Sequence, residues 1–162
     1  MTTRVDELTA ADVMSRVLVT VEADETPLMA WELMRRSQVH HLPVVDRRGH
    51  VEGILTREAI AARWGGGPET MERQSVGELL GCERRPRVCP DTPLPQVAAT
   101  MLDAGCDAVP VVSESGALLG LITSVDLLAV LAGRPIRERV RPDTTPALFR
   151  MEPVLPPPQA RR

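Results

Sequence analysis

The chain has 162 residues, of which 43% are hydrophobic and 25% are charged, and its formal net charge at pH 7 is −3. Because the 22 acidic residues outnumber the 19 basic ones, all of which are arginine, the chain has no strong positive field, and neither nucleic acid nor an anionic membrane is favoured as a partner. The apolar content is sufficient for a buried core.

The beginning of the chain is charged, with Arg4, Asp6 and Glu7, and it lacks the apolar core of a signal peptide. No apolar run approaches the roughly 20 residues that a membrane-spanning helix needs. The three cysteines are odd in number and show no C-x-x-C spacing, so neither a disulfide framework nor a zinc site is indicated. We therefore expect a cytoplasmic protein with no membrane segment and no metal site.

A first structural unit is expected over residues 9–64, after an N-terminal segment of residues 1–8. It opens with a short extended run at residues 17–21. Thr26 followed by Pro27 is typical of a helix start, because the Thr hydroxyl can cap the first turn and Pro suits the first helical position.

Two β runs follow, at residues 41–45 and 51–55, and the intervening Asp46-Arg47-Arg48-Gly49 has the composition of a turn. Together they predict a β-hairpin. Thr56 then opens a second helix that extends to about Arg63. The unit therefore has the order βαββα.

The sequence Gly65-Gly66-Gly67-Pro68 interrupts regular structure, so residues 65–74 are expected to form a linker. A second unit is expected over residues 75–132. Beyond it the chain is rich in Pro and Arg, and residues 133–162 are expected to form a flexible tail.

The second unit repeats the first, because a shift of 67 residues aligns the two halves without a gap. The aligned pairs include Val21 with Val88, Met34 with Met101, Pro43 with Pro110, Gly53 with Gly120 and Thr56 with Thr123. Upstream the register slips by one residue, which predicts a longer loop in the second copy. By this repeat, Thr92-Pro93 opens one helix, and Thr123 opens another from Ser124 to about Leu131.

Each copy carries an apolar run with Pro-Val-Val, then a turn, then glycine, two apolar residues and Thr. These are Leu42-Pro43-Val44-Val45-Asp46 with Gly53-Ile54-Leu55-Thr56, and Val109-Pro110-Val111-Val112 with Gly120-Leu121-Ile122-Thr123-Ser124-Val125-Asp126. Two βαββα units of this kind resemble the paired domains named after cystathionine β-synthase (CBS), also called a Bateman module. The resemblance covers roughly residues 9–132.

The resemblance implies an α+β fold in which two pseudo-symmetric repeats pack sheet to sheet and leave two clefts. In the family these clefts accept adenine nucleotides (AMP, ADP or ATP) or S-adenosylmethionine, and two modules associate as a homodimer. The resemblance therefore implies a regulatory module without catalytic activity or a required cofactor, which acts on another protein. No P-loop, G-x-G-x-x-G or nucleophile motif points to an enzyme.

The segment Thr123-Ser124-Val125-Asp126 has a physical interpretation of its own. Thr123 and the first free amides of the following helix meet at one point, which suits a polar or anionic ligand. Asp126 can accept hydrogen bonds from the two vicinal hydroxyls of a ribose. The alternative is structural, with Thr123 and Asp126 forming a helix cap.

The first copy departs from this pattern, because Ala59 stands at the position of Asp126. Glu58 lies one position earlier, about 100° round the helix, and is not expected to point at the same place. This cleft is therefore empty, or binds weakly through Thr56 and Arg57, or lends Arg57 to a ligand anchored by the second copy. We favour the last interpretation.

Other candidate ligand residues come from the family pattern. His41 aligns with Ala108, on the strand edge that lines the cleft, so His41, Ala108, Val109 and Pro110 are expected near the ligand; a structural role for His41 is the alternative. His40 and His41 are adjacent and should face opposite sides of a strand, which argues against a shared metal.

Two other functions compete with ligand sensing. One is a ligand-free dimerisation scaffold, since apolar residues on the helices are expected to exceed what one module can bury: Trp31, Met34, Leu127 and Leu131. The other is nucleic-acid binding through Arg134, Arg137, Arg139 and Arg141, which is disfavoured by an aromatic content of 2%.

Overall fold

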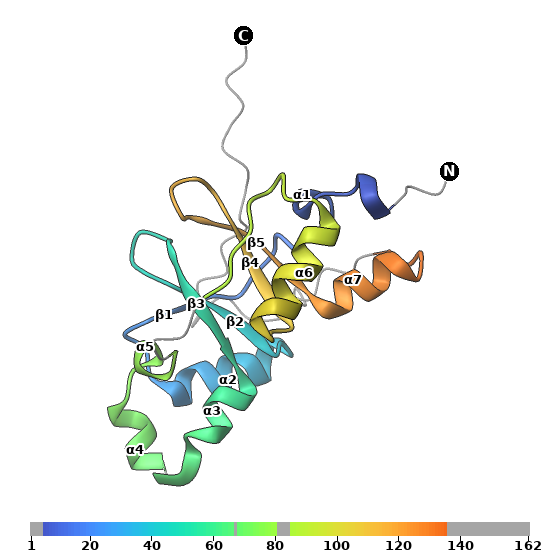
Figure 1. Ribbon diagram of the computed structural model, residues 1–162. Coiled ribbons are helices and arrows are strands. Elements are labelled where there is room, and N and C mark those ends of the chain that lie inside the picture. The colour runs from blue at the N-terminus through green and yellow to red at the C-terminus, as the bar shows by residue number, and fades with distance from the viewer. Residues whose placement is uncertain (1–4, 67, 81–84, 136–162) are drawn as a thin grey trace.

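The computed structural model describes residues 5–66, 68–80 and 85–135, which form two α+β units (Figure 1). The first unit contains β1 (Val21–Glu22), α2 (Pro27–Ser37), β2 (His41–Val45), β3 (Val51–Thr56) and α3 (Arg57–Ala62). The second contains α6 (Leu94–Ala104), β4 (Ala108–Val112), β5 (Leu118–Thr123) and α7 (Ser124–Leu131). The predicted fold class is confirmed.

The hairpins form at the predicted positions. β2 pairs antiparallel with β3, with Pro43 opposite Ile54, and β4 pairs with β5 in the equivalent register. The turn glycines Gly49 and Gly116 have φ of 82° and 87°, a region that side chains rarely adopt. Of the extended run predicted at residues 17–21, only Val21 belongs to a strand, because β1 spans Val21–Glu22.

Helix α2 begins as predicted, since the Thr26 hydroxyl accepts a hydrogen bond from Met29 N at 3.2 Å. The prediction for its counterpart α6 is wrong by one residue. Pro93 is the N-cap there, and the Thr92 hydroxyl instead accepts from Cys89 N at 3.0 Å. Thr92 therefore closes the turn that precedes the helix.

Two short helices are exchanged between the halves of the chain. α1 (Ala10–Val13) packs into the core of the second unit, and α5 (Val76–Leu79) packs into the core of the first. Backbone hydrogen bonds of 2.8 Å repeat this exchange, from Ala10 N to Thr92 O and from Val76 N to Glu25 O. Each folded unit is therefore built from both halves of the sequence. The longer loop predicted for the second copy falls partly on residues 81–84, which lie outside the described residues.

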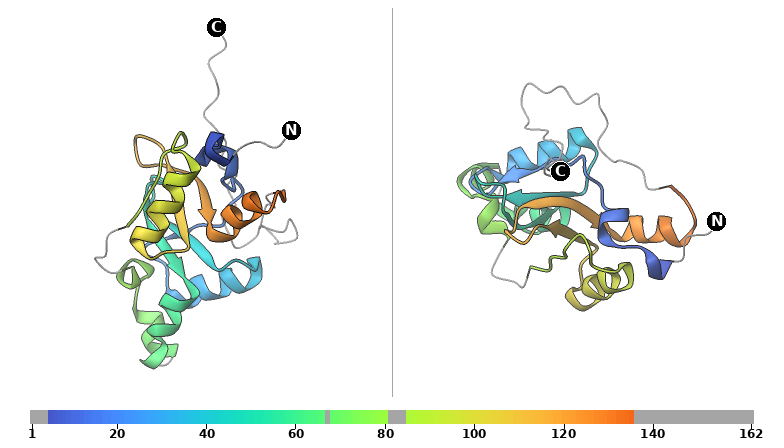
Figure 2. Two further views of the ribbon diagram at one scale, coloured as in Figure 1. Left: turned by 45° about the vertical axis from the view of Figure 1, so that its right-hand side comes forward. Right: turned by 90° about the horizontal axis from the view of Figure 1, so that it is seen from above.

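The sheets of the two units meet at an apolar cluster shared by both halves: Leu18, Val51, Ala108, Val112, Leu118 and Leu121. The hairpin tips bond reciprocally, from Leu118 N to Gly49 O and from Val51 N to Gly116 O, both at 3.1 Å. This reciprocity is the signature of a pseudo-two-fold axis. Figure 2 shows the strands lying between α2 on one side and α6 on the other.

The predicted linker is partly helical. It contains the end of η2 (Trp64–Gly66) and α4 (Pro68–Arg73), and α4 packs against α2. A further short helix, η1 (Val5–Glu7), lies in the predicted N-terminal segment. The predicted tail beyond residue 135, with most of its arginine cluster, lies outside the described residues. Among the helices that are described, none is long and apolar enough to cross a membrane.

The glycines of the two repeat motifs provide space for the exchanged segments. A Cβ on Gly120 would lie 2.5–2.9 Å from Met14 atoms, including the rigid Met14 Cβ, whereas a Cβ on Gly53 would lie 3.2 Å from the flexible end of Leu80. We expect Gly120→Ala to lower the free energy of unfolding by about 1–3 kcal/mol and Gly53→Ala by less than about 1 kcal/mol. Urea denaturation measures both losses, and equal losses would contradict the close approach of Met14.

Candidate functional site

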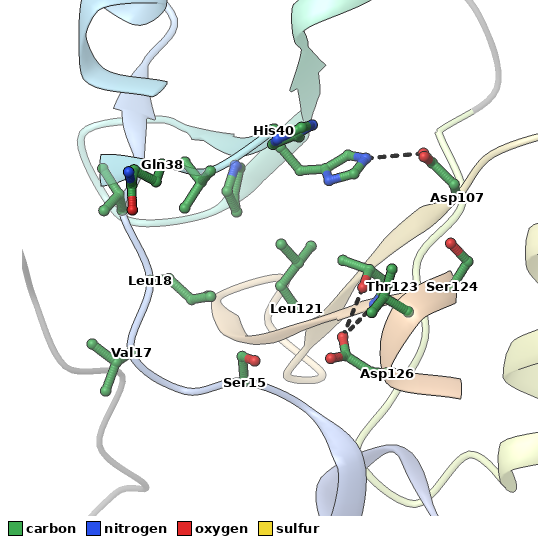
Figure 3. A pocket seen from close by; sticks show the side chains of 15 residues that line it. Ser15, Val17, Leu18, Gln38, His40, Asp107, Leu121, Thr123, Ser124 and Asp126 are labelled. Carbon is green, nitrogen blue, oxygen red and sulfur yellow. Dashed lines mark hydrogen bonds and ion pairs between the residues drawn. The ribbon is translucent and has the colours of Figure 1, made fainter. Parts of the chain in front are cut away.

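Two clefts lie at the junction of the two units. Cleft A has a volume of about 330 Å³ (Figure 3) and is lined by Ser15, Val17, Leu18, Val19, Gln38, Val39, His40, His41, Pro43, Asp107, Leu121, Thr123, Ser124, Val125 and Asp126. Cleft B has a volume of about 450 Å³ and is lined by His41, Val51, Glu52, Gly53, Ile54, Thr56, Glu58, Leu80, Arg85, Pro86, Arg87, Ala104, Gly105, Cys106, Asp107, Ala108 and Pro110.

Asp126 occupies both a cap position and the wall of cleft A. Its Oδ2 accepts hydrogen bonds from Thr123 N at 2.8 Å and from Thr123 Oγ1 at 2.9 Å, and the residue is only 3% exposed. The structural interpretation of this pair is therefore correct as far as the cap is concerned. Because the carboxylate also lines the cleft, the cap holds it in place at the surface that a ligand would meet.

Ser15 lines cleft A from the segment after α1. Its backbone pairs with Leu121 in both directions, at 2.9 and 3.1 Å, and the residue is 5% exposed. Its Oγ makes no hydrogen bond within the part of the chain that the structure describes. In Figure 3 the side chain points toward the space bordered by Leu18 and Leu121. A buried hydroxyl without a partner carries a desolvation cost that a polar ligand atom would remove.

His41 and Asp107 form the wall that the two clefts share. His41 Nε2 lies 2.9 Å from Asp107 Oδ1, and the two side chains are 12% and 66% exposed. His41 belongs to β2 of the first unit, and Asp107 precedes β4 of the second. This pair therefore joins the two units. His40 precedes the strand and also lines cleft A, contrary to the expectation that the two histidines face opposite sides.

The predicted residues of the second copy divide between the clefts. Ser124 lines cleft A with Thr123 and Asp126, whereas Ala108 and Pro110 line cleft B. Val109 lines neither, because alternate residues of a strand face opposite sides and its side chain is fully buried in the core of the second unit.

The first-copy residues also differ from expectation. Thr56 lines cleft B and caps α3 by accepting from Ala59 N at 3.1 Å. Glu58 lines cleft B as well, although it was expected to point elsewhere. Arg57 lines neither cleft, and its Nη2 donates to Met34 O at 3.4 Å. The geometry therefore does not support the expectation that Arg57 reaches a ligand in cleft A.

Two arginines that the sequence pattern did not single out line cleft B. Arg85 and Arg87 lie in the segment that leads to Val88, and Arg85 Nη1 donates a hydrogen bond to Glu52 O. Cys106 lines the same cleft, and burial raises the pKa of its thiol. Across residues 5–66, 68–80 and 85–135, no group of three or more His, Cys, Asp or Glu residues is arranged to hold a metal ion.

The sequence model of the CBS domain family matches residues 10–65 and 76–133. L-aspartate semialdehyde sulfurtransferase of Methanocaldococcus jannaschii is 25% identical over 123 residues, which are 76% of this chain and 23% of that protein. The chain spans between 23% and 29% of the length of three such curated relatives.

Two solved structures share the fold. One is the CBS domain pair of protein MJ0100 in complex with 5′-methylthioadenosine and S-adenosyl-L-methionine, with a TM-score of 0.65, 24% identity, and coverage of 78% of this chain and 97% of that one. The other is CBSX2 in complex with AMP, with a TM-score of 0.66, 23% identity, and coverage of 77% and 96%.

The caps at Asp126 and Asp12 allow a matched comparison, because Asp12 Oδ2 also accepts from Thr9 N and Thr9 Oγ1, both at 2.8 Å. Asp126→Ala should lower the free energy of unfolding by about 1–2 kcal/mol, since it leaves two buried donors without an acceptor. Asp12→Ala, at an exposed cap, should cost about 0.5–1 kcal/mol. Urea denaturation of both variants measures the difference, and a smaller loss at Asp126 would contradict its buried cap.

Proposed function

The chain belongs to the CBS domain family, in which it forms a tandem pair, and from that premise we propose that it is a regulatory module that binds adenosine-containing molecules and catalyses no reaction. Cleft A is the primary binding site. The ligands of the two similar structures, AMP in one and 5′-methylthioadenosine with S-adenosyl-L-methionine in the other, support this chemical class.

The observation that carries the proposal is the unpartnered Ser15 hydroxyl in the same cleft as the Asp126 carboxylate. The carboxylate accepts hydrogen bonds from the ribose hydroxyls. Apolar walls at Val39 and Leu121 cover the faces of the base, and Ser15 Oγ meets one of its polar edge atoms. One adenosine-containing molecule would then both hydrogen-bond the Ser15 hydroxyl and cover the apolar side chains of the cleft wall.

Regulation follows from the composition of the walls of cleft A. Val39 and His41 come from the first unit, whereas Leu121 and Asp126 come from the second. A ligand that contacts both favours one relative orientation of the units. The free energy available for such a shift equals the difference in ligand affinity between the two orientations.

We also propose that a second copy of the chain covers the exposed face of α7. Leu128 and Leu131 are 61% and 69% exposed, and Val125 lies on the same helix and is exposed as well. Part of the surface expected from the sequence is not available, because Met34 is fully buried and Trp31 packs against Trp64, with ring centroids 5.8 Å apart. The dimer surface is therefore assigned to α7.

The ligand-free scaffold is the second candidate. It is favoured by the Asp126 cap, which forms without a ligand, and by Ala59 at the equivalent position of the first copy. In this alternative the repeats serve the α7 surface alone, and neither cleft has an occupant.

Ser15→Ala separates the two candidates. Removing a buried hydroxyl that lacks a partner should leave stability unchanged or raise it by about 1 kcal/mol, while it should weaken adenosine binding by about 3- to 10-fold through loss of one hydrogen bond. Ser37 provides a matched control, because its Oγ is also buried without a hydrogen-bond partner among the described residues and it lines neither cleft. Ser37→Ala should leave affinity unchanged.

Thermal unfolding and calorimetric titration with adenosine, AMP and S-adenosylmethionine give the two readouts. If the wild-type protein binds none of these compounds, the sensing function is wrong and the scaffold is retained.

The dimer is tested by light scattering. We expect a mass of about twice the 17.7 kDa of one chain for the wild type, and a mass near one chain for Leu128→Glu, because a charge would enter the centre of an apolar interface. Met29→Glu changes a residue of similar type on α2, 43% exposed, and should leave the mass unchanged. A wild-type mass of one chain at micromolar concentration would contradict the dimer.

A further inference from the structure

Helices α2 and α6 end in the same backbone conformation at equivalent positions of the two repeats. The C-cap of α2 is Gln38, with φ of 55° and ψ of 33°, and the C-cap of α6 is Gly105, with φ of 62° and ψ of 32°. In both copies the amide of the following residue donates to the equivalent helix carbonyl, at 3.1 and 3.0 Å. The turn that ends the helix is therefore the same in both copies, although its central residue differs.

Gln38 is the less favourable residue for this turn. A positive φ brings Cβ close to a backbone carbonyl oxygen, a contact that glycine avoids because it has no Cβ. Among the residues that the structure describes, Gln38 is the one non-glycine residue with a positive φ. The turn alone does not explain a glutamine at this position, and a side chain held in a strained conformation directs attention to the site that it faces.

The two helix ends lie at different clefts, Gln38 at cleft A and Gly105 at cleft B. In Figure 3 Gln38 lies at the opposite end of cleft A from Asp126, with Leu18 and Leu121 between them. Gln38 is exposed, and its amide makes no hydrogen bond to the other residues drawn around the cleft. At Gly105 a Cβ would meet nothing within 4 Å. Cleft A therefore has a side-chain amide at a place where cleft B has open space.

An amide at this place matches the edge of an adenine base. Adenine presents a 6-amino donor beside a ring nitrogen acceptor, and the amide of glutamine offers one acceptor and one donor in the same plane. Val39, whose side chain covers a face of the base in the proposed function, directly follows Gln38 in the chain. With the ribose held at Asp126, the base extends away from that carboxylate and toward the end of the cleft where Gln38 lies.

We infer that Gln38 makes cleft A selective for adenine. Its amide oxygen accepts a hydrogen bond from the 6-amino group, and its amide nitrogen donates to the neighbouring ring nitrogen. This inference rests on the proposed function, since it names the part of the ligand that cleft A distinguishes. A glycine would relieve the backbone at this position but could not reach the base, which accounts for the difference from Gly105.

A pair of nucleosides that differ only in the 6-amino group tests this role. The probes are adenosine and purine riboside, and AMP with purine riboside 5′-monophosphate repeats the comparison on phosphate-bearing ligands. Gln38→Gly removes the side chain, and Gln38→Met keeps its length without the amide. Gln96→Met is the matched control, because Gln96 is an exposed glutamine on α6 that lines neither cleft.

In calorimetric titration the wild type should bind the 6-amino member of each pair about 5- to 10-fold more tightly, through the additional hydrogen bond. Both Gln38 variants should bind the two members within about 2-fold of each other, and Gln96→Met should keep the wild-type preference. Gln38→Gly should also raise the melting temperature by about 1–3 °C, since glycine relieves the backbone. Loss of the preference in a more stable protein separates recognition of the base from damage to the fold.

Two results would overturn the role of Gln38 while the sensing function stands. One is a wild type that binds both members of each pair equally, and the other is a preference that survives in both Gln38 variants. If the wild type binds none of the four probes, the sensing function and the role of Gln38 are both wrong.

Discussion

The exchange of short helices between the two halves is the constraint on which the rest of the structure depends. α1 and α5 each supply apolar residues to the core of the other unit, so neither half can complete its core alone. The close approach of Met14 to Gly120 explains why a glycine stands in the β5 motif. The same crossing places Ser15 against Leu121 and thereby forms one wall of cleft A.

The pseudo-two-fold symmetry relates the backbones of the two units but not the side chains that line the two clefts. The reciprocal hydrogen bonds at the hairpin tips join equivalent positions, and equivalent threonines cap α3 and α7. However, the position of Asp126 is occupied by Ala59 in the other copy, and the two arginines of cleft B lie in a loop whose counterpart leads into cleft A without an arginine among its lining residues. The two repeats therefore form two clefts with a similar backbone arrangement, and substitutions at a few positions give the clefts different lining side chains.

The wall between the clefts has a second consequence. Because His41 and Asp107 come from different units and line both clefts, a ligand that displaces one partner of this pair acts on the other cleft directly. A coupling of this kind would need no long pathway through the core, since one hydrogen-bonded pair lines both clefts.

The sequence by itself determined the repeated architecture. The hairpins and the start of α7 were predicted because Pro-Val-Val, the turn glycine and the capping Thr act within a few residues of one another. The same local logic identified Thr123 and Asp126. It was wrong by one residue at α6, where Pro93 is the N-cap and the Thr92 hydroxyl instead accepts a hydrogen bond from Cys89 N.

Only the tertiary structure decided which residues share a cleft. Ser15, Arg85 and Asp107 lie in connecting segments with no motif, and they reach the clefts because the helix exchange and the pseudo-two-fold packing bring those segments together. Val109 and Arg57 occupy positions of the repeat at which the sequence predicted ligand contact. However, Val109 faces the core because strand residues alternate between faces, and Arg57 donates a hydrogen bond to Met34 O instead. Contacts between residues far apart in the chain depend on how the two units pack, and local sequence patterns do not encode that packing.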